Sequence, residues 1–128
     1  MRLLLDTHLL LWAAAEPELL SDVAQRLIDE PDNELLFSSA SLWEVAIKQS
    51  RRQQDFDVDP RLLRRNLLVN GYSELAVGGD HAVAVADLPL LHKDPFDLLL
   101  IAQSTVERIT LLTSDRVVAS YPGPIERV

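Results

Sequence analysis

Four acidic residues are the strongest candidates for chemistry in this chain: Asp6, Glu44, Asp97 and Asp115. Two follow apolar runs with the length of buried strands, and two stand near predicted helix starts. In a parallel sheet, groups that follow the strands gather at one edge, so we expect the four carboxylates to meet there. We expect no Lys or Arg to neutralise them, and they would repel one another strongly. A hard divalent cation such as Mg²⁺ or Mn²⁺, which prefers oxygen ligands, would relieve that repulsion.

The segment 92–115 should position two of these acids. Asp94 before Pro95 marks a helix start, with an Asx cap and then proline where a missing N–H costs nothing. Asp97 then lies in the first helical turn, near the positive end of the helix dipole. The apolar run 109–113 predicts a buried strand that ends just before Asp115. Each of the four acids also has an ordinary structural interpretation, as a cap, a first-turn acid or part of a capping box.

The rest of the chain alternates strands with helices. The predicted strands are 3–5, 34–38, 75–77, 109–113 and a short edge strand at Ile125. The predicted helices are 8–15 capped by Thr7, 21–30 capped by Ser21, one opened by the capping box Ser41–Glu44, 60–69, and 80–87 capped by Asp80. Uniformly apolar strands in this alternation predict an α/β protein. We expect a three-layer α/β/α sandwich with a mainly parallel sheet of four to five strands, in one domain over residues 1–128.

Composition excludes several functional classes. The 128 residues contain no cysteine, which excludes disulfides, thiolate metal sites and a cysteine nucleophile. No signal peptide and no membrane-length apolar run is visible, so we expect a cytoplasmic protein without a membrane partner. The net charge of −8 argues against a broad nucleic-acid-binding surface, though not against a metal-dependent nuclease. Half of the twelve basic residues fall in one stretch, which could be a solvated face or contact RNA phosphates: Lys48, Arg51, Arg52, Arg61, Arg64 and Arg65.

The four acids stand within four motifs that run through nearly the whole chain: Leu4–Trp12, Ser38–Lys48, His92–Gln103 and Leu112–Asp115. In this order and at these intervals they resemble the PIN-domain family, and within it the VapC-type toxins of bacterial toxin–antitoxin pairs. The resemblance implies a Mg²⁺- or Mn²⁺-dependent endoribonuclease that cleaves RNA phosphodiester bonds. It implies a catalytic quartet, with Asp6, Asp97 and Asp115 as the metal ligands. It also implies an antitoxin partner and commonly a homodimer.

Other polar residues in these motifs could support the acids by hydrogen bonding, or could be simple caps: Thr7, Ser38, Asp94 and Thr113. Two positions depart from the subgroup that the chain resembles. Leu98 stands where Arg often follows the Asp-Pro-Phe-Asp motif, and Arg108-Ile109 stands where a glycine is common before the fourth strand. Neither departure removes an acid, although Leu98 could alter the grip on substrate. We expect Trp12 and Trp43 to be core residues.

Three other functions share some of these sequence features. A phosphoacceptor receiver module is also acidic and doubly wound, but it would have an acidic pair after its first strand and a lysine after its last. A haloacid-dehalogenase-like phosphatase would need Asp-x-Asp after the first strand, whereas Asp6-Thr7-His8 lacks the second acid. A PIN fold kept only for binding, without turnover, remains open.

Overall fold

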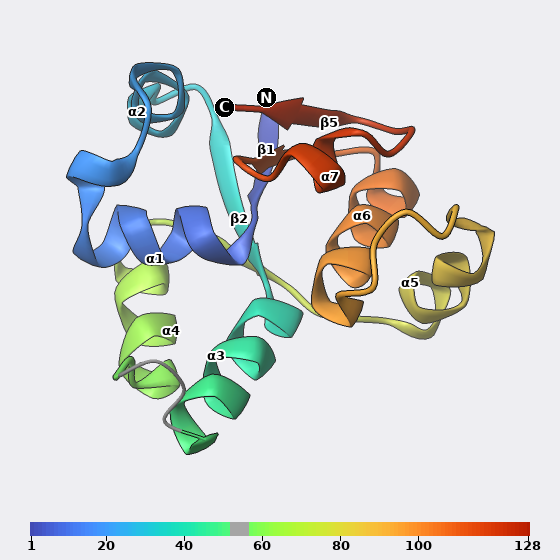
Figure 1. The fold of residues 1–128 in the computed structure, drawn as a ribbon. Helices are drawn as coiled ribbons and strands as arrows, with labels where there is room; N and C mark the ends of the chain where they lie inside the picture. Colours follow the sequence, from blue (N-terminus) through green and yellow to red (C-terminus); the bar gives the residue numbers. More distant parts are fainter. Residues whose placement is uncertain (52–56) are drawn as a thin grey trace.

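A five-stranded parallel sheet crosses the centre of the computed structural model, which describes residues 1–51 and 57–128 (Figure 1). The strands are β1 (Arg2–Leu5), β2 (Glu34–Ser38), β3 (Ser73–Leu75), β4 (Thr110–Thr113) and β5 (Ile125–Arg127). They lie in the order β3-β2-β1-β4-β5, and every neighbouring pair is parallel. The predicted sheet is therefore confirmed. Because β1 lies between β2 and β4, the carboxyl ends of these three strands are adjacent.

Helices cover both faces of the sheet, which confirms the three-layer arrangement. The α-helices are α1 (Thr7–Ala15), α2 (Asp22–Asp29), α3 (Ser39–Arg51), α4 (Pro60–Val69), α5 (Gly79–Ala84), α6 (Pro95–Glu107) and α7 (Arg116–Ala119). Short 3₁₀ turns are η1 (Pro17–Leu19) and η3 (Val85–Asp87). Leu3 and Leu5 of β1 pack in one core cluster with α1, α2, α3 and α4, and Leu4 packs in a second cluster with α6 and α7. This alternation is the period of two that a buried strand requires.

Aspartates cap the two helices that flank the sheet edge. Asp6 Oδ1 accepts a hydrogen bond from the N–H of Leu9 at 2.9 Å, so the prediction that Thr7 caps α1 was wrong. Thr7 is instead the first residue of that helix. Asp94 Oδ1 accepts hydrogen bonds from the N–H groups of Phe96 at 2.9 Å and Asp97 at 3.3 Å, which confirms the predicted start of α6.

The capping box predicted at Ser41–Glu44 was also wrong. Helix α3 begins at Ser39, because Ser38 at the end of β2 accepts a hydrogen bond from the N–H of Ala40 at 3.0 Å. Ser41 therefore lies in the first turn of the helix and Glu44 in the second, and both are buried. The chain enters α3 directly from β2, which brings the first turns of this helix to the carboxyl edge of the sheet.

Two further boundaries differ from the predictions. Strand β3 covers 73–75 rather than 75–77, because it pairs only with the last three residues of β2. Helix α5 is capped at Gly78 instead of Asp80, and it gives way to η3 at Val85. The Gly78 N–H donates to His81 Nδ1 at 2.9 Å, which takes the place of an aspartate cap.

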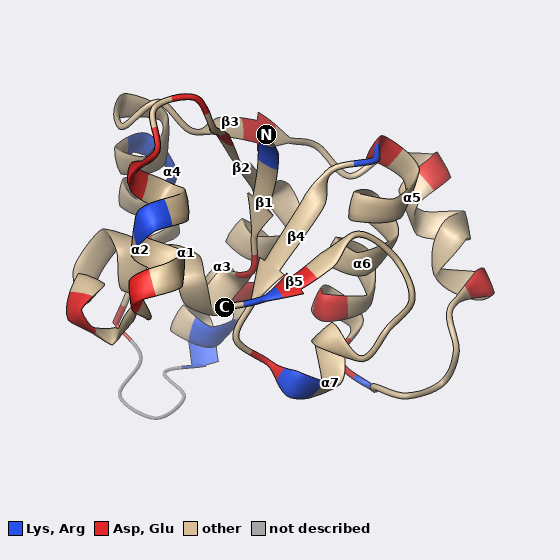
Figure 2. Ribbon diagram, turned by 90° about the horizontal axis from the view of Figure 1, so that it is seen from above, with Lys and Arg blue, Asp and Glu red and all other residues tan. Residues whose placement is uncertain are grey.

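The basic stretch predicted at 48–65 is divided between two helices. Lys48 and Arg51 lie on α3, and Arg61, Arg64 and Arg65 lie on α4. Arg52 falls outside the described residues. Helix α4 packs against α1 and α3, on the other side of the sheet from α6 (Figures 1 and 2). In the described residues, no helix is long and apolar enough to cross a membrane.

Arg108, at the end of α6, has a left-handed backbone with φ of 57° and ψ of 47°. This is the position where the sequence departs from the expected glycine. The left-handed conformation costs a side-chain-bearing residue about 1–2 kcal/mol, part of which glycine's greater unfolded-state entropy offsets. We expect Arg108→Gly to raise the free energy of unfolding by about 0.5–1 kcal/mol in urea denaturation.

The control for this prediction is a substitution in the opposite direction, from glycine to alanine, at a glycine that also has a positive φ. Gly71 has φ of +88°, and a Cβ added there meets nothing within 4 Å. Gly71→Ala should therefore lower the free energy of unfolding by about 1 kcal/mol through backbone strain alone. If Arg108→Gly lowers stability as Gly71→Ala does, Arg108 is held by contacts that outweigh its strain.

Candidate functional site

One threonine hydroxyl connects the ends of the two central strands. Thr113, at the end of β4, donates to Asp6 Oδ2 at 2.6 Å and accepts from the N–H of Asp115 at 3.0 Å. Asp6 follows β1 directly and is only 4% exposed. The carboxylate of Asp6 is thus fixed on one oxygen by Thr113 and on the other by the cap of α1.

Burial makes the negative charge of Asp6 costly. Desolvation is the main reason that the pKa of Asp6 is raised above its ordinary value, although the bonds from Thr113 and Leu9 oppose the shift. The charge of Asp115 raises the pKa of Asp6 further, whereas His8 lowers it. Asp115 is half-buried, and its Oδ1 caps α7 through the N–H groups of Val117 and Val118.

Glu44 reaches the same region from the second turn of α3. Its side chain is 4% exposed, and Oε2 accepts from Lys48 Nζ at 2.8 Å. The prediction that no Lys or Arg neutralises the acids was therefore wrong for Glu44. Its other oxygen, Oε1, is buried and has no hydrogen-bond partner in the described ranges 1–51 and 57–128. A buried carboxylate oxygen without a donor is costly, so a bound cation or a hydrogen-bond donor at this atom would be favourable.

Asp97 completes the group from the first turn of α6. Its Oδ2 lies 2.8 Å from Nε2 of His92. Burial is the largest cause that raises the pKa of Asp97 to about 6, and the hydrogen bond to His92 opposes the shift. The charges of Asp94, Glu44 and Asp6 raise it further, in that order. Asp97 is thus close enough to both Glu44 and Asp6 to respond to their charges.

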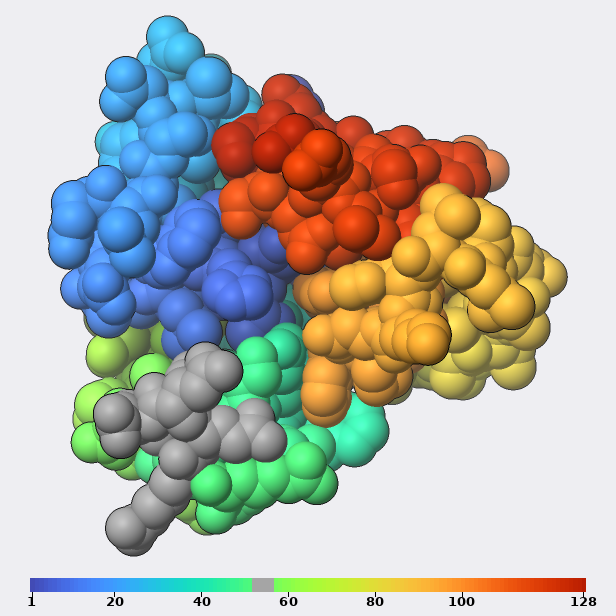
Figure 3. Space-filling view, viewed as in Figure 1, coloured from blue at the N-terminus to red at the C-terminus, as the bar shows by residue number. Residues whose placement is uncertain are grey.

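These mutual effects show that the four acids share one region of the molecule. Figure 3 shows the same region from outside, where the blue start of α1, the green α3, the orange α6 and the red segment after β4 meet. The four are not in mutual contact, however. Among the described residues, the only groups of three ligand atoms within 4.8 Å of one another are His92–Asp94–Asp97 and Asp80–His81–Glu107. A cation that retains several waters, as Mg²⁺ does, suits such a loose set of oxygens.

The four residues predicted to support the acids have different surroundings. Thr113 contacts Asp6 as described, and Asp94 caps the helix of Asp97. Thr7 donates instead to the hydroxyl of Ser41 at 2.9 Å, and Ser38 binds the backbone of α3. Within 1–51 and 57–128, neither Thr7 nor Ser38 hydrogen-bonds to any of the four acids.

A sequence model of the PIN domain matches residues 3–124 of this chain. The chain belongs to the PIN-domain family. A search of curated proteins found no match.

Solved structures have the same fold as this PIN domain. VapBC2 from Rickettsia felis, bound to a DNA fragment from its promoter, is 16% identical with a TM-score of 0.74, covering 100% of this chain and 99% of that chain. A toxin–antitoxin complex from Klebsiella pneumoniae is 16% identical with a TM-score of 0.63, covering 98% of each. VapBC-1 from nontypeable Haemophilus influenzae is 16% identical with a TM-score of 0.59, covering 90% of this chain and 87% of that chain.

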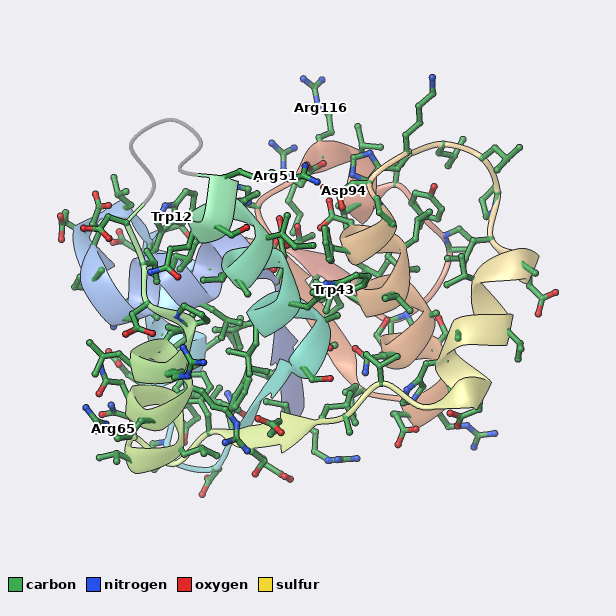
Figure 4. All side chains as sticks on the ribbon, turned by 90° about the horizontal axis from the view of Figure 1, so that it is seen from below. Trp12, Trp43, Arg51, Arg65, Asp94 and Arg116 are labelled. Carbon is green, nitrogen blue, oxygen red and sulfur yellow. The ribbon has the colours of Figure 1, made fainter. Side chains whose placement is uncertain are left out.

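Three residues of this PIN domain have surroundings that the sequence analysis missed. Lys48 could have been paired with Glu44 from their spacing of four residues on one helix, which brings side chains together. His92 lies outside the helix of Asp97, so no periodicity predicts their contact. Trp43 was predicted as core but is 55% exposed, and its ring meets Phe96 edge-on between α3 and α6 at 4.9 Å (Figure 4).

The Thr113 hydroxyl offers a direct test of how this PIN domain holds Asp6. Thr113→Val keeps the shape but leaves Asp6 Oδ2 and the Asp115 N–H without their partner. We expect the free energy of unfolding to fall by about 1–3 kcal/mol, because both groups lie in or beside the buried edge. Thr113→Ser retains the hydroxyl and should cost less than Thr113→Val. Equal losses for the two variants would show that the Thr113 hydroxyl does not account for the stability lost in Thr113→Val.

Proposed function

We propose that this PIN domain is a metal-dependent endoribonuclease and the toxin of a VapC-type toxin–antitoxin pair. The observation that carries the proposal is the unpartnered Oε1 of Glu44, buried beside two other acids of raised pKa. A bound cation would relieve the repulsion among these acids, which Lys48 offsets only at Glu44. The family match and the toxin–antitoxin structures of the same fold favour RNA cleavage over other uses of that cation.

The chemistry of the site fits Mg²⁺ or Mn²⁺. Asp6, Asp97 and Asp115 would hold the ion, and Glu44 would complete the catalytic quartet. These groups offer only carboxylate oxygens, the ligands that both ions prefer. When bound, the ion would activate a water and stabilise the charge that develops on the phosphodiester during attack.

The chain's own residues prepare the site for that ion. Thr113 and the Leu9 N–H hold the two oxygens of Asp6 from opposite sides. Asp94 fixes the backbone of Asp97 at the start of α6. Asp97, with a pKa of about 6, is mostly ionised at neutral pH and can therefore attract a cation. Lys48 holds one oxygen of Glu44, and the other has no hydrogen-bond partner among the described residues.

The test is RNA cleavage by the purified protein. Wild type should cleave single-stranded RNA internally in Mg²⁺ or Mn²⁺, stop in EDTA, and resume when excess metal is added. Cleavage that continues in EDTA would contradict a metal-dependent centre. Absence of cleavage of every RNA tested, together with tight metal binding, would favour the alternative of a non-catalytic binding module.

The receiver-like alternative is not supported by the fold. Receiver modules have the strand order 2-1-3-4-5, in which the third strand neighbours the first. In this chain β4 takes that place, and β3 lies at the edge beyond β2. The PIN-domain match over residues 3–124 agrees with this distinction.

The proposed partner is a cognate antitoxin. The structures from R. felis and H. influenzae are VapBC assemblies, and the K. pneumoniae structure is a toxin–antitoxin complex. In this chain, a cavity of about 420 Å³ lies between α1, α2 and α4, with Leu20, Ile28 and Leu67 among its lining residues. It would accept side chains from a partner helix that docks over α1, α2 and α4, and the polar lining residues Gln25, Asn66 and Asn70 could hydrogen-bond to that helix. The homodimer is a prediction that rests on the resemblance alone.

A further inference from the structure

His92 lies in the segment between η3 and α6, three residues before α6 begins. Its Nε2 lies 2.8 Å from Asp97 Oδ2, and the two side chains are only 22% and 19% exposed. An ionised carboxylate has no hydrogen to donate, so the ring must carry its hydrogen on Nε2 and donate it to Asp97. This is the one side-chain hydrogen bond to the Asp97 carboxylate among the described residues.

Asp97 is thus fixed by two residues that precede it in the chain. The Asp94 carboxylate accepts from the Asp97 N–H and sets the backbone. His92 holds Oδ2 and so sets the rotation of the carboxylate, and Oδ1 accepts no hydrogen bond from the part of the chain that the structure describes. Glu44 and Asp6, the acids whose charges Asp97 feels, lie on the other elements at this edge.

We propose that His92 is a positioning residue that turns the free oxygen of Asp97 toward the cation site. The inference rests on the proposed metal-dependent function and adds a residue to it. Carboxylates that bind metals are commonly held by such outer hydrogen bonds, and losing one costs about 10–100-fold in metal affinity. His92 thereby acts on the metal through Asp97, without touching it.

Direct ligation by His92 is the competing arrangement. The ligand atoms of His92, Asp94 and Asp97 do lie within 4.8 Å of one another. However, the Nε2 that would face the metal is the atom that donates to Asp97, and it would first have to lose its hydrogen. One oxygen of Asp94 is also engaged by two backbone N–H groups. The geometry therefore favours an orienting hydrogen bond over a metal–nitrogen bond.

Titration calorimetry with Mn²⁺, in the absence of RNA, tests the inference. It uses two variants whose side chains have about the same size as histidine. His92→Met has no N–H donor, and we expect its Mn²⁺ affinity to fall by about tenfold or more. His92→Gln places an amide N–H near Nε2, and its affinity should stay within about threefold of wild type. His8→Gln is the matched control: His8 lies near Asp6, but among the described residues its side chain hydrogen-bonds to no acid, so its loss should not weaken binding.

Each outcome has a distinct meaning. Equal Mn²⁺ affinity for wild type and His92→Met would overturn the positioning role while leaving the metal site intact. Loss of affinity in both His92→Met and His92→Gln, with a directly bound ¹⁴N in the electron spin echo spectrum of Mn²⁺-loaded wild type, would replace positioning with ligation. Failure of wild type to bind Mn²⁺ would overturn the proposed function together with this inference.

Discussion

Replacing Asp97 with asparagine should lower kcat/KM for RNA by about 100- to 1,000-fold while the protein stays folded. The expected loss reflects several kcal/mol of charge stabilisation that depends on the bound cation, at about 1.4 kcal/mol for each factor of ten. Asparagine fits the same space and can still accept from His92 through its amide oxygen. It carries no charge to hold a cation, so the structural and catalytic roles of Asp97 separate in this variant.

The matched control is the same substitution at the same kind of helix position. Asp22 lies in the first turn of α2, as Asp97 does in α6, but on a helix of the opposite layer. Asp22→Asn should leave kcat/KM unchanged. RNA cleavage by folded Asp97→Asn at a rate near that of wild type would remove Asp97 from the site.

The second large effect is on the stability of the metal-free protein. The pKa of Asp97 is raised from 3.8 to about 6, so the folded state holds this proton more tightly than the unfolded state. Stability from this group is therefore fully present below pH 3.8 and is lost as pH rises through about 6. A shift of this size corresponds to about 3 kcal/mol, and the raised pKa of Asp6 adds a change of the same sign.

Urea denaturation in EDTA, compared between wild type and Asp97→Asn, isolates this effect from other titrations. The free energy of unfolding of wild type should fall relative to the variant by about 2–2.5 kcal/mol between about pH 4 and pH 7.5. Mn²⁺ should then restore wild type at the higher pH and have less effect on the variant. If the difference in free energy of unfolding between the two proteins does not change with pH, the ionised Asp97 carboxylate does not destabilise the folded state.

Local sequence signals predicted the structure correctly where one or two adjacent residues determine it. Asp94-Pro95 predicts the start of α6 because a cap and a proline act within one turn, and the structure has that start. The apolar strands predicted a parallel sheet because neither face could be left to solvent. The convergence of Asp6, Asp97 and Asp115 follows from that sheet, since each acid adjoins a strand or helix end at the same edge.

The sequence did not predict the features that depend on contacts between elements distant in the chain. Thr113 and Asp6 are 107 residues apart, and only the pairing of β1 with β4 brings them together. The contact between His92 and Asp97 depends on a segment without regular structure. The range of β3 depends on where its partner β2 stops, which no pattern within residues 73–77 records.

The most direct test of the central claim is the anomalous difference map of a crystal soaked in Mn²⁺. We expect a peak at the carboxyl edge of β1 and β4, with oxygens of Asp6, Asp97 and Asp115 as its protein ligands and water completing the shell. Asp97→Asn crystals should lose this peak. Absence of Mn²⁺ from that edge in wild type, or a peak only at Asp80, His81 and Glu107, would contradict a metal centre built from the four acids.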